Sequence, residues 1–201
     1  MKTLLSMMAC GVAAIGLAVA APAVGSQAPD FTGMTASGKR ISLSEFEGKK
    51  VVLEWTNDGC PFVQKHYDSG NMQALQKKVT SDGTVWISII SSAPGQQGHA
   101  TPEQANTLTK DRNAAPNYVV LDESGEIGKL YGAKTTPHMF VIDEAQTLQY
   151  AGAIDSIPSS NQADISRATN YVTAALNSLR SGEAVVTRQS QPYGCSVKYA
   201  S

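Results

Sequence analysis

The stretch "EWTNDGCPFVQKHY", residues 54–67, places a single cysteine between the pattern of a strand and the pattern of a helix. The run "KVVLEW", residues 50–55, is densely apolar, which is typical of a buried central strand. Pro61 suits the first position of a helix because proline has no N–H group to leave unpaired. Since turn-forming residues 57–59 stand between the two patterns, we predict that Cys60 lies at a strand-to-helix junction.

The position of Cys60 predicts its chemistry. The first turn of a helix exposes N–H groups and carries a partial positive charge, which favours a thiolate over a thiol. The pKa of the thiol is then lower than its free value of roughly 8.5. A thiolate is a nucleophile that attacks a disulfide sulfur or a peroxide oxygen. A buried, inert cysteine is the alternative, but the surrounding turn residues and Pro61 favour a catalytic Cys60.

Strand and helix patterns alternate along the chain, which predicts an α/β fold with a mixed sheet. The closing pattern is strand, strand, helix, so we expect an antiparallel hairpin at one edge of the sheet. The expected strands are residues 50–55, 84–91, 117–122, 135–143 and 148–155. The expected helices start at Pro61, with an interruption at Gly70, and cover residues 101–112, 125–132 and 164–180.

The composition favours one globular domain and excludes several functions. The chain has 201 residues, of which 42% are hydrophobic, and this length is enough to bury a core. The formal net charge is −1 and the sequence has no basic run, so binding to nucleic acid has no electrostatic support. We find no phosphate-binding loop, dinucleotide fingerprint or zinc knuckle, and we therefore predict no cofactor.

The first residues predict export. Lys2 supplies a positive start, residues 4–20 are apolar, and the small residues at 18 and 20 fit a cleavage site. We expect a signal peptide over residues 1–20 and a periplasmic or secreted protein, with a membrane anchor or a lipid on Cys10 as alternatives. Removal of the signal would leave Cys60 and Cys195, and two thiols in an oxidising compartment can form a disulfide.

Cys195 lies in a tail, residues 181–201, which ends in "QPYGCSVKYAS". Gly194 allows a close backbone approach, and Val197 and Tyr199 alternate as in a short strand that could dock on the domain. A long loop is no obstacle, since closure entropy grows by only about 0.6 kcal/mol per doubling of length. We hypothesise that Cys195 resolves the oxidised Cys60. A permanent structural disulfide and a bond to a second chain are the alternatives.

Residues 26–180 resemble the thioredoxin superfamily, in its redoxin and peroxiredoxin-like branch of AhpC/TSA type. The resemblance is carried by "GSQAPDF" with "SLSEFEGKKVVLEW", by "CPF" after a strand, and by "TTPHMFVID", which is similar to the proline loop of the family. It implies a thioredoxin-like fold, in which helices flank a mixed central sheet. It also implies a cis Pro137, preceded by Thr136, that faces Cys60.

Two departures separate this chain from well-known members of that superfamily. Val63 stands where the second cysteine of C-x-x-C would be. The peroxiredoxin pattern P-x-x-x-T-x-x-C is also not met, because Thr56 lies four positions before Cys60 instead of three. The redox helix therefore has a single cysteine.

Other residues near this stretch are candidates for supporting roles. The resemblance implies that Glu54 relays protons, whereas a solvated edge position is the alternative. We expect Trp55 to pack beside the site and His66 to be a partly exposed helix residue. Arg112 or Lys134 would supply the positive charge that peroxide chemistry needs.

A copper site is the alternative of a different class. Cys60, His138, Met139 and Cys195 include soft ligands of the kind that copper prefers. His138 could also lie near the thiolate, or it could point away from it as a strand residue.

Taken together, these patterns predict an exported thiol oxidoreductase with catalytic Cys60 and Cys195, supported by Pro137, Thr136, Trp55 and Glu54. Its partners would be a thiol or disulfide protein or a small peroxide, together with an external reductant. A peroxiredoxin-like peroxidase and a copper-binding or non-catalytic binding protein are the alternatives.

Overall fold

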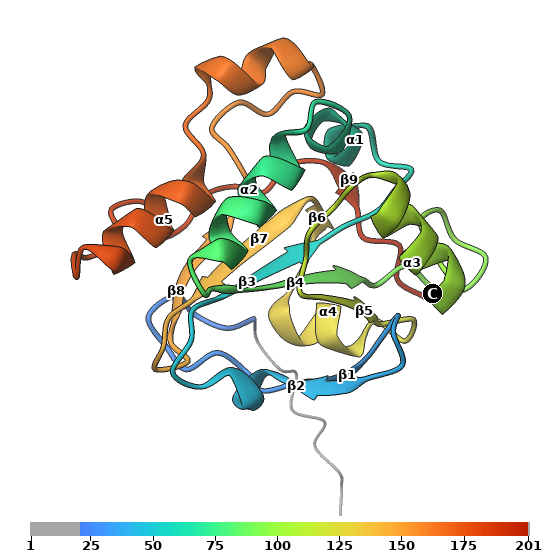
Figure 1. Cartoon of the computed structure of the whole chain (residues 1–201), viewed down its shortest axis with the longest axis horizontal. Helices are drawn as coiled ribbons and strands as arrows, with labels where there is room; N and C mark the ends of the chain where they lie inside the picture. The colour runs from blue at the N-terminus through green and yellow to red at the C-terminus, as the bar shows by residue number, and fades with distance from the viewer. Residues whose placement is uncertain (1–20, 201) are drawn as a thin grey trace, which may run out of the picture.

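The computed structural model describes residues 21–200, so the predicted signal peptide and Cys10 lie outside the described residues. A mixed seven-stranded sheet forms the centre, in the order β2-β1-β5-β4-β3-β7-β8 (Figure 1). Helices cover the sheet, and the predicted α/β class is confirmed. No helix in this part of the chain is both long enough and apolar enough to cross a bilayer.

The elements follow the predicted patterns closely. The sheet contains β1 (Thr32–Thr35), β2 (Arg40–Ser42), β3 (Val51–Trp55), β4 (Val85–Ile90), β5 (Tyr118–Leu121), β7 (His138–Ile142) and β8 (Leu148–Gly152). The α-helices are α1 (Pro61–Asp68), α2 (Asn71–Ser81), α3 (Pro102–Asp111), α4 (Glu126–Tyr131) and α5 (Tyr171–Arg180). Two 3-10 helices, η1 (Leu43–Phe46) and η2 (Gln162–Arg167), and two short strands, β6 (Thr135–Thr136) and β9 (Cys195–Ser196), complete the fold.

The central strands explain why the apolar runs in the sequence are continuous. β3 and β4 pair in parallel and every residue of both strands is buried. A strand covered on both faces has no solvent-facing positions, so it has no need of polar alternation. β7 joins β3 in the antiparallel sense and forms the predicted hairpin with β8 at the edge of the sheet.

The two faces of the sheet carry different core clusters. One cluster contains Trp55, Tyr131 and Phe140 and includes residues of α4, which lies below β4 in Figure 1. The other contains Val52, Trp86 and Cys60 and includes residues of α1, α2 and α5. Alternate side chains of one strand point to opposite faces, so Val52 and Trp55 enter different clusters.

The predicted helix over residues 164–180 is wrong at its beginning. The 3-10 helix η2 ends at Arg167, Ala168 is extended, and α5 starts only at Tyr171. Asn170 caps α5, because its side chain accepts a hydrogen bond from the Thr173 amide at 2.8 Å. An asparagine that bonds the backbone in this way favours a helix start over a helix interior.

The tail docks on the domain as predicted, and Figure 1 shows it in red, running from α5 past β6 toward α3. Its strand β9 pairs with β6 in the antiparallel sense, with Cys195 opposite Thr136. Beyond β9, the Ala93 amide donates to the Lys198 carbonyl at 2.8 Å, and the Tyr199 hydroxyl donates to the Ala133 carbonyl at 2.8 Å. Contacts beyond β9 therefore hold the end of the tail in place.

Replacing Gly194 by alanine is expected to release the tail from β6. Gly194 has a φ of +132°, and a Cβ built there would lie 2.0 Å from the Thr136 carbonyl oxygen, which the backbone cannot accommodate without moving. The Cys195 and Val197 amides should then exchange with deuterium at least about tenfold faster. The matched control is Gly182→Ala, since Gly182 also has a positive φ, of +70°, but no neighbour within 4 Å. Equal exchange in both variants would contradict this account.

Candidate active site

Local sequence places Cys60 at the start of α1. Cys60 is the N-cap residue and Pro61 is the first residue of the helix. The Asn57 side chain accepts a hydrogen bond from the Gly59 amide at 2.9 Å, and the Cys60 amide donates to the Asn57 carbonyl at 3.1 Å. The residues between the strand and the helix therefore form the tight turn that the sequence predicted.

Tertiary contacts bring the other predicted residues to Cys60. The Cys60 side chain is wholly buried, and its thiol donates to the Thr136 carbonyl oxygen at 3.1 Å. The bond between Thr136 and Pro137 is cis, as the resemblance implied. The Cys195 amide donates to the Cys60 sulfur at 3.4 Å, and neither cysteine forms a disulfide. Cys60, Thr136, Pro137 and Cys195 thus meet at one place.

The two thiols have pKa values that move in opposite directions. Burial by itself opposes ionisation of Cys60, but hydrogen bonds from the side chains of Cys195 and Thr136 and from the amides of Cys195 and Val63 outweigh it and lower its pKa. Burial and the hydrogen bond to Cys60 raise the pKa of Cys195 to about 11. Cys60 is therefore the thiol of the pair that ionises first.

Thiolate absorbance near 240 nm should titrate below the ordinary thiol value of roughly 8.5 in the reduced protein. Replacing Cys195 by alanine should raise the midpoint, because the Cys60 thiolate loses a hydrogen-bond donor. The Cys60→Ser variant identifies the signal, since it should lose the low-pH step and keep only the Cys195 step, which shifts to lower pH because the Cys60 charge is gone. A wild-type midpoint at or above 8.5 would show that Cys60 is not activated.

Glu54 lies on β3 between β4 and β7, so the solvated-edge alternative is wrong. Its carboxylate is wholly buried and accepts hydrogen bonds from four side chains. The donors are the Tyr67 hydroxyl at 2.9 and 3.2 Å, the Ser88 hydroxyl at 2.8 Å, the Trp86 indole at 2.9 Å and the Gln76 amide at 3.3 Å. Burial nevertheless raises the pKa of Glu54, so it keeps a proton at higher pH than an exposed carboxyl. Its role as a proton relay stays a prediction.

The stability of the protein should report the raised pKa of Glu54. A group whose pKa is higher in the folded chain contributes its full stability below the unfolded value, roughly 4.3, and loses it as the pH rises through the folded value. The free energy of unfolding of the wild type, relative to Glu54→Gln, should therefore fall with rising pH, by about 1.4 kcal/mol for each unit of pKa difference. Urea denaturation at a series of pH values measures it.

Glu144→Gln serves as a control for the same measurement, because the stability difference should change with pH in the opposite direction. A hydrogen bond from Lys50 lowers the pKa of Glu144, so the stability that Glu144 contributes is lost as the pH falls. The wild type should therefore gain stability relative to Glu144→Gln as the pH rises. Parallel pH profiles for the two variants would contradict the assignment of a raised pKa to Glu54.

Two predicted site residues lie elsewhere. Trp55 packs in the opposite core cluster, where its indole donates to the Ser91 hydroxyl at 3.0 Å. His138 stacks on Phe140 with ring centroids 4.5 Å apart, and it accepts a hydrogen bond from the Lys134 amide. Burial lowers the pKa of His138 to about 3, so this ring is neutral. His138 is the strand residue that points away from Cys60, because its neighbour Met139 is the one that packs in the Cys60 cluster.

The prediction that His66 is partly exposed is wrong. The face of α1 that carries Lys65 and His66 is turned toward the buried Asp155 carboxylate. His66 is wholly buried, its Nε2 atom lies 3.7 Å from the Asp155 carboxylate, and burial lowers its pKa to about 4. Lys65 is also buried and donates to Asp155 at 3.2 Å. The Tyr193 hydroxyl of the tail donates to the same carboxylate.

Sequence reasoning missed Tyr193, although a signal was present. Residues two positions apart in an extended segment point to the same side, so Tyr193 and Cys195 face the domain together. The ring of Tyr193 lies edge-on against Phe62 with centroids 5.8 Å apart. Tyr193, two positions before β9, thus anchors the tail to the helix that begins at Cys60.

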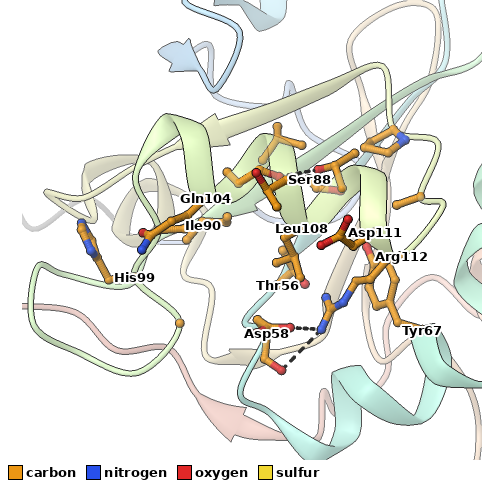
Figure 2. A pocket seen from close by; sticks show the side chains of 18 of the residues that line it. Thr56, Asp58, Tyr67, Ser88, Ile90, His99, Gln104, Leu108, Asp111 and Arg112 are labelled. Atoms are coloured by element: carbon orange, nitrogen blue, oxygen red, sulfur yellow. Dashed lines mark hydrogen bonds and ion pairs between the residues drawn. The ribbon is translucent and has the colours of Figure 1, made fainter.

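A pocket of about 580 Å³ lies between the turn before Cys60 and α3. Figure 2 shows Asp58 and Arg112 facing each other at one side of this pocket, with His99 and Gln104 at the other. Arg112 forms an ion pair with Asp58 and lies over the Tyr67 ring, 4.6 Å from its centroid. Of the two predicted cationic residues, Arg112 is therefore the one beside the turn, whereas Lys134 is exposed.

The described residues contain no group of three or more histidine, cysteine, aspartate or glutamate side chains that could hold a metal ion. His138 lies away from Cys60 and Cys195, so the ligand set suggested by the sequence does not gather at one point.

With this geometry established, comparisons with known proteins assign the family. Residues 24–151 match the AhpC/TSA family. The chain belongs to the AhpC/TSA family. The match includes β3, Cys60 and the cis-proline loop, and it stops before α5 and the tail. The family match therefore covers Cys60 and not Cys195.

Curated relatives divide between two kinds of redox protein. The chain is 28% identical over 126 residues to the thiol-disulfide oxidoreductase ResA of Bacillus thuringiensis, which covers 60% of this chain and 64% of ResA. It is 30% identical over 129 residues to a Coxiella burnetii protein that carries the peroxiredoxin name bcp, covering 60% of this chain and 82% of that protein. The alignment thus spans less than two thirds of ResA.

Solved structures show the fold. A hypothetical protein, SMc02350, from Sinorhizobium meliloti matches 90% of this chain and 97% of its own with a TM-score of 0.75 and 23% identity. Structures described as a thioredoxin and a thioredoxin-like protein match with TM-scores of 0.51 and 0.52. The predicted thioredoxin-like fold is therefore confirmed.

Proposed function

We propose that this AhpC/TSA protein is an exported thiol oxidoreductase in which Cys60 attacks the oxidised substrate and Cys195 resolves the product. The observation that carries the proposal is the 3.4 Å approach of the Cys195 amide to the Cys60 sulfur. Pairing of β9 with β6 creates this approach and brings the only two cysteines of residues 21–200 together. The apolar segment over residues 4–20 supports export.

A hydroperoxide substrate gives a balanced first reaction. The Cys60 thiolate attacks the terminal peroxide oxygen, the O–O bond breaks, and the alcohol leaves with a proton. Cys60 is then a sulfenic acid and the peroxide has been reduced. The Cys195 sulfur attacks the Cys60 sulfur, the S–O bond breaks, and the thiol proton leaves with the hydroxyl group as water. The product is a disulfide between Cys60 and Cys195.

A disulfide substrate leads to the same product. The Cys60 thiolate attacks one substrate sulfur and expels a thiolate, which forms a mixed disulfide. Cys195 then attacks the Cys60 sulfur and the second substrate thiol leaves. Each route transfers two electrons to the substrate and leaves one protein disulfide, which an external thiol must reduce.

The peroxidase alternative has one observation in its favour. Val63 packs in the buried core cluster beside Cys60, so the position that would hold a second helix cysteine contributes only packing. Reduction of a peroxide needs only one attacking sulfur on this helix. The relative that is 30% identical and carries a peroxiredoxin name also supports the peroxidase alternative.

The two cysteines should have separable roles in activity. Cys60→Ser should lose reduction of a small peroxide or a model disulfide by about a thousandfold or more, to background, because the attacking sulfur is gone. Cys195→Ser should still react once but accumulate sulfenic or sulfinic acid at Cys60, since no second thiol condenses with it. Intact-mass and peptide mass spectrometry after one equivalent of peroxide distinguish these products.

Metal-free protein serves as the control, and it distinguishes the proposed redox activity from the copper-binding alternative. Treatment with a chelator should leave the turnover unchanged. If the reduced wild type has no activity, and instead binds one equivalent of Cu(I) tightly through Cys60, the copper-binding alternative replaces this proposal. If Cys195 stays free while Cys60 is oxidised in the wild type, the resolving role is wrong.

A further inference from the structure

We infer that the tail determines which class of substrate reacts with Cys60, because it occupies the place that an extended polypeptide would need. Hydroperoxides and small disulfides react with Cys60, whereas a disulfide within a polypeptide reacts only in molecules whose tail has been displaced. This inference rests on the proposed nucleophilic role of Cys60 and specifies the substrates of that site. The pairing of the tail with β6, the anchors of the tail and the burial of Cys60 support it.

The tail itself shows where an extended polypeptide lies when it brings a cysteine to Cys60. Pairing with β6 puts Cys195 opposite Thr136 and its amide 3.4 Å from the Cys60 sulfur, close to α1 in Figure 1. The Val197 amide continues this contact, since it donates to the Lys134 carbonyl at 3.1 Å. A polypeptide substrate that approached in the same way would add a strand to the same edge of β6. Because β9 already holds this edge, the two chains compete for one place.

Close packing prevents a polypeptide from lying between the tail and β6. Gly194 has a φ of +132°, and a Cβ built there would lie 2.0 Å from the Thr136 carbonyl oxygen. The Cys60 side chain is 0% exposed beneath this contact. Thiol–disulfide exchange requires the Cys60 sulfur to reach a sulfur of the substrate. A polypeptide disulfide therefore has to displace the tail before it reacts.

The anchors of the tail favour it over a free polypeptide. Tyr193 donates to Asp155 before β9, and Tyr199 donates to the Ala133 carbonyl after β9. The tail is also tethered to the domain, and a short tether gives a bound segment an effective concentration on the order of millimolar. A polypeptide reacts only with the fraction of molecules whose tail is open, so its rate falls in proportion to that fraction.

Small substrates avoid this competition. A hydroperoxide, or a disulfide between two single residues, needs no backbone pairing with β6. It needs only an opening of its own width beside the Cys60 sulfur. An opening that breaks few contacts costs less free energy than release of the whole tail, so it occurs more often. The tail therefore separates substrates by their size and by their need for strand pairing.

The reaction of either kind of disulfide is balanced without a further reactant. The Cys60 thiolate bonds to one substrate sulfur, the substrate S–S bond breaks, and the first thiol leaves with a proton from solvent. Cys195 then bonds to the Cys60 sulfur, and the second substrate thiol leaves with the proton of Cys195. The substrate gains two electrons, and the protein loses two as its disulfide forms.

Two disulfides with the same reactive group test the inference in a single turnover. The small one is N,N′-diacetylcystine bisamide. The large one joins two copies of a nonapeptide of glycine, serine and alanine with a central cysteine. Reduced wild-type protein should release thiol from the small disulfide at least about tenfold faster than from the large one, measured by acid quenching and chromatography. The rates of both disulfides with glutathione correct for intrinsic reactivity, and a corrected ratio close to one would overturn the inference.

Gly194→Ala connects this ratio to the tail. Release of the tail should accelerate the reaction with the peptide disulfide and lower the corrected ratio toward one. A change in the ionisation of Cys60 cancels in the ratio, because both rates depend on the same thiolate. Gly182→Ala is the matched control and should keep the wild-type ratio, since Gly182 has no neighbour within 4 Å. A ratio that stays high in Gly194→Ala, although amide exchange shows a released tail, contradicts the inference.

Tyr193→Phe takes the place of Gly194→Ala if that variant does not fold or keeps its tail docked. It retains the ring that packs on Phe62 and removes only the hydroxyl that donates to Asp155. The corrected ratio should fall below the wild-type ratio because the tail has lost one anchor. An unchanged ratio would show that the tail does not control access.

Failure of the proposed function has a different signature. In that case the reduced wild type neither consumes hydrogen peroxide nor releases thiol from the small disulfide. Equal corrected rates for the two disulfides would leave the proposed function intact and remove only the role assigned to the tail. Consumption of peroxide with no release of thiol from either disulfide would have the same meaning.

Discussion

The antiparallel pairing of Cys195 with Thr136 is the contact on which this site depends. It is formed by two strands of two residues each, so backbone hydrogen bonding alone holds it weakly. Side chains on both sides of β9 supply the rest, with Tyr193 anchored to Asp155 and Tyr199 anchored to Ala133. A cysteine of the tail thereby lies beside Cys60, whereas α1 itself has no second cysteine.

The same contact sets the protonation of the two thiols. Because the Cys195 thiol and amide both donate to the Cys60 sulfur, a negative charge on Cys60 is stabilised and a charge on Cys195 is not. A single arrangement of donors therefore lowers the pKa of one thiol and raises the pKa of the other, although the two side chains are chemically identical. Displacing the tail would remove this difference.

Buried polar groups under the site tie α1 to the rest of the fold. A buried ion pair is tolerated when the remaining hydrogen-bonding capacity of each ion is satisfied. Lys65 donates to Asp155 and to the Ile157 carbonyl, while Asp155 also accepts from Tyr193 and from the Ile157 amide. Tyr193 thus completes the surroundings of a buried carboxylate, which gives the tail a stabilising role. On the central strand, Glu54 is enclosed by four donors in a comparable way.

The sequence by itself determined the features that depend on short-range chemistry. Continuous apolar runs predicted the buried strands, and turn residues followed by Pro61 predicted a helix that starts at Cys60, because these signals act within a few residues. Only the tertiary structure decided that Glu54 is buried among donors, that His66 faces Asp155 and that His138 points away from Cys60. It also decided that Cys195 lies beside Cys60 across 135 positions of the chain. Such contacts depend on how separate elements pack, and no local pattern encodes which distant backbone will fill the edge of β6.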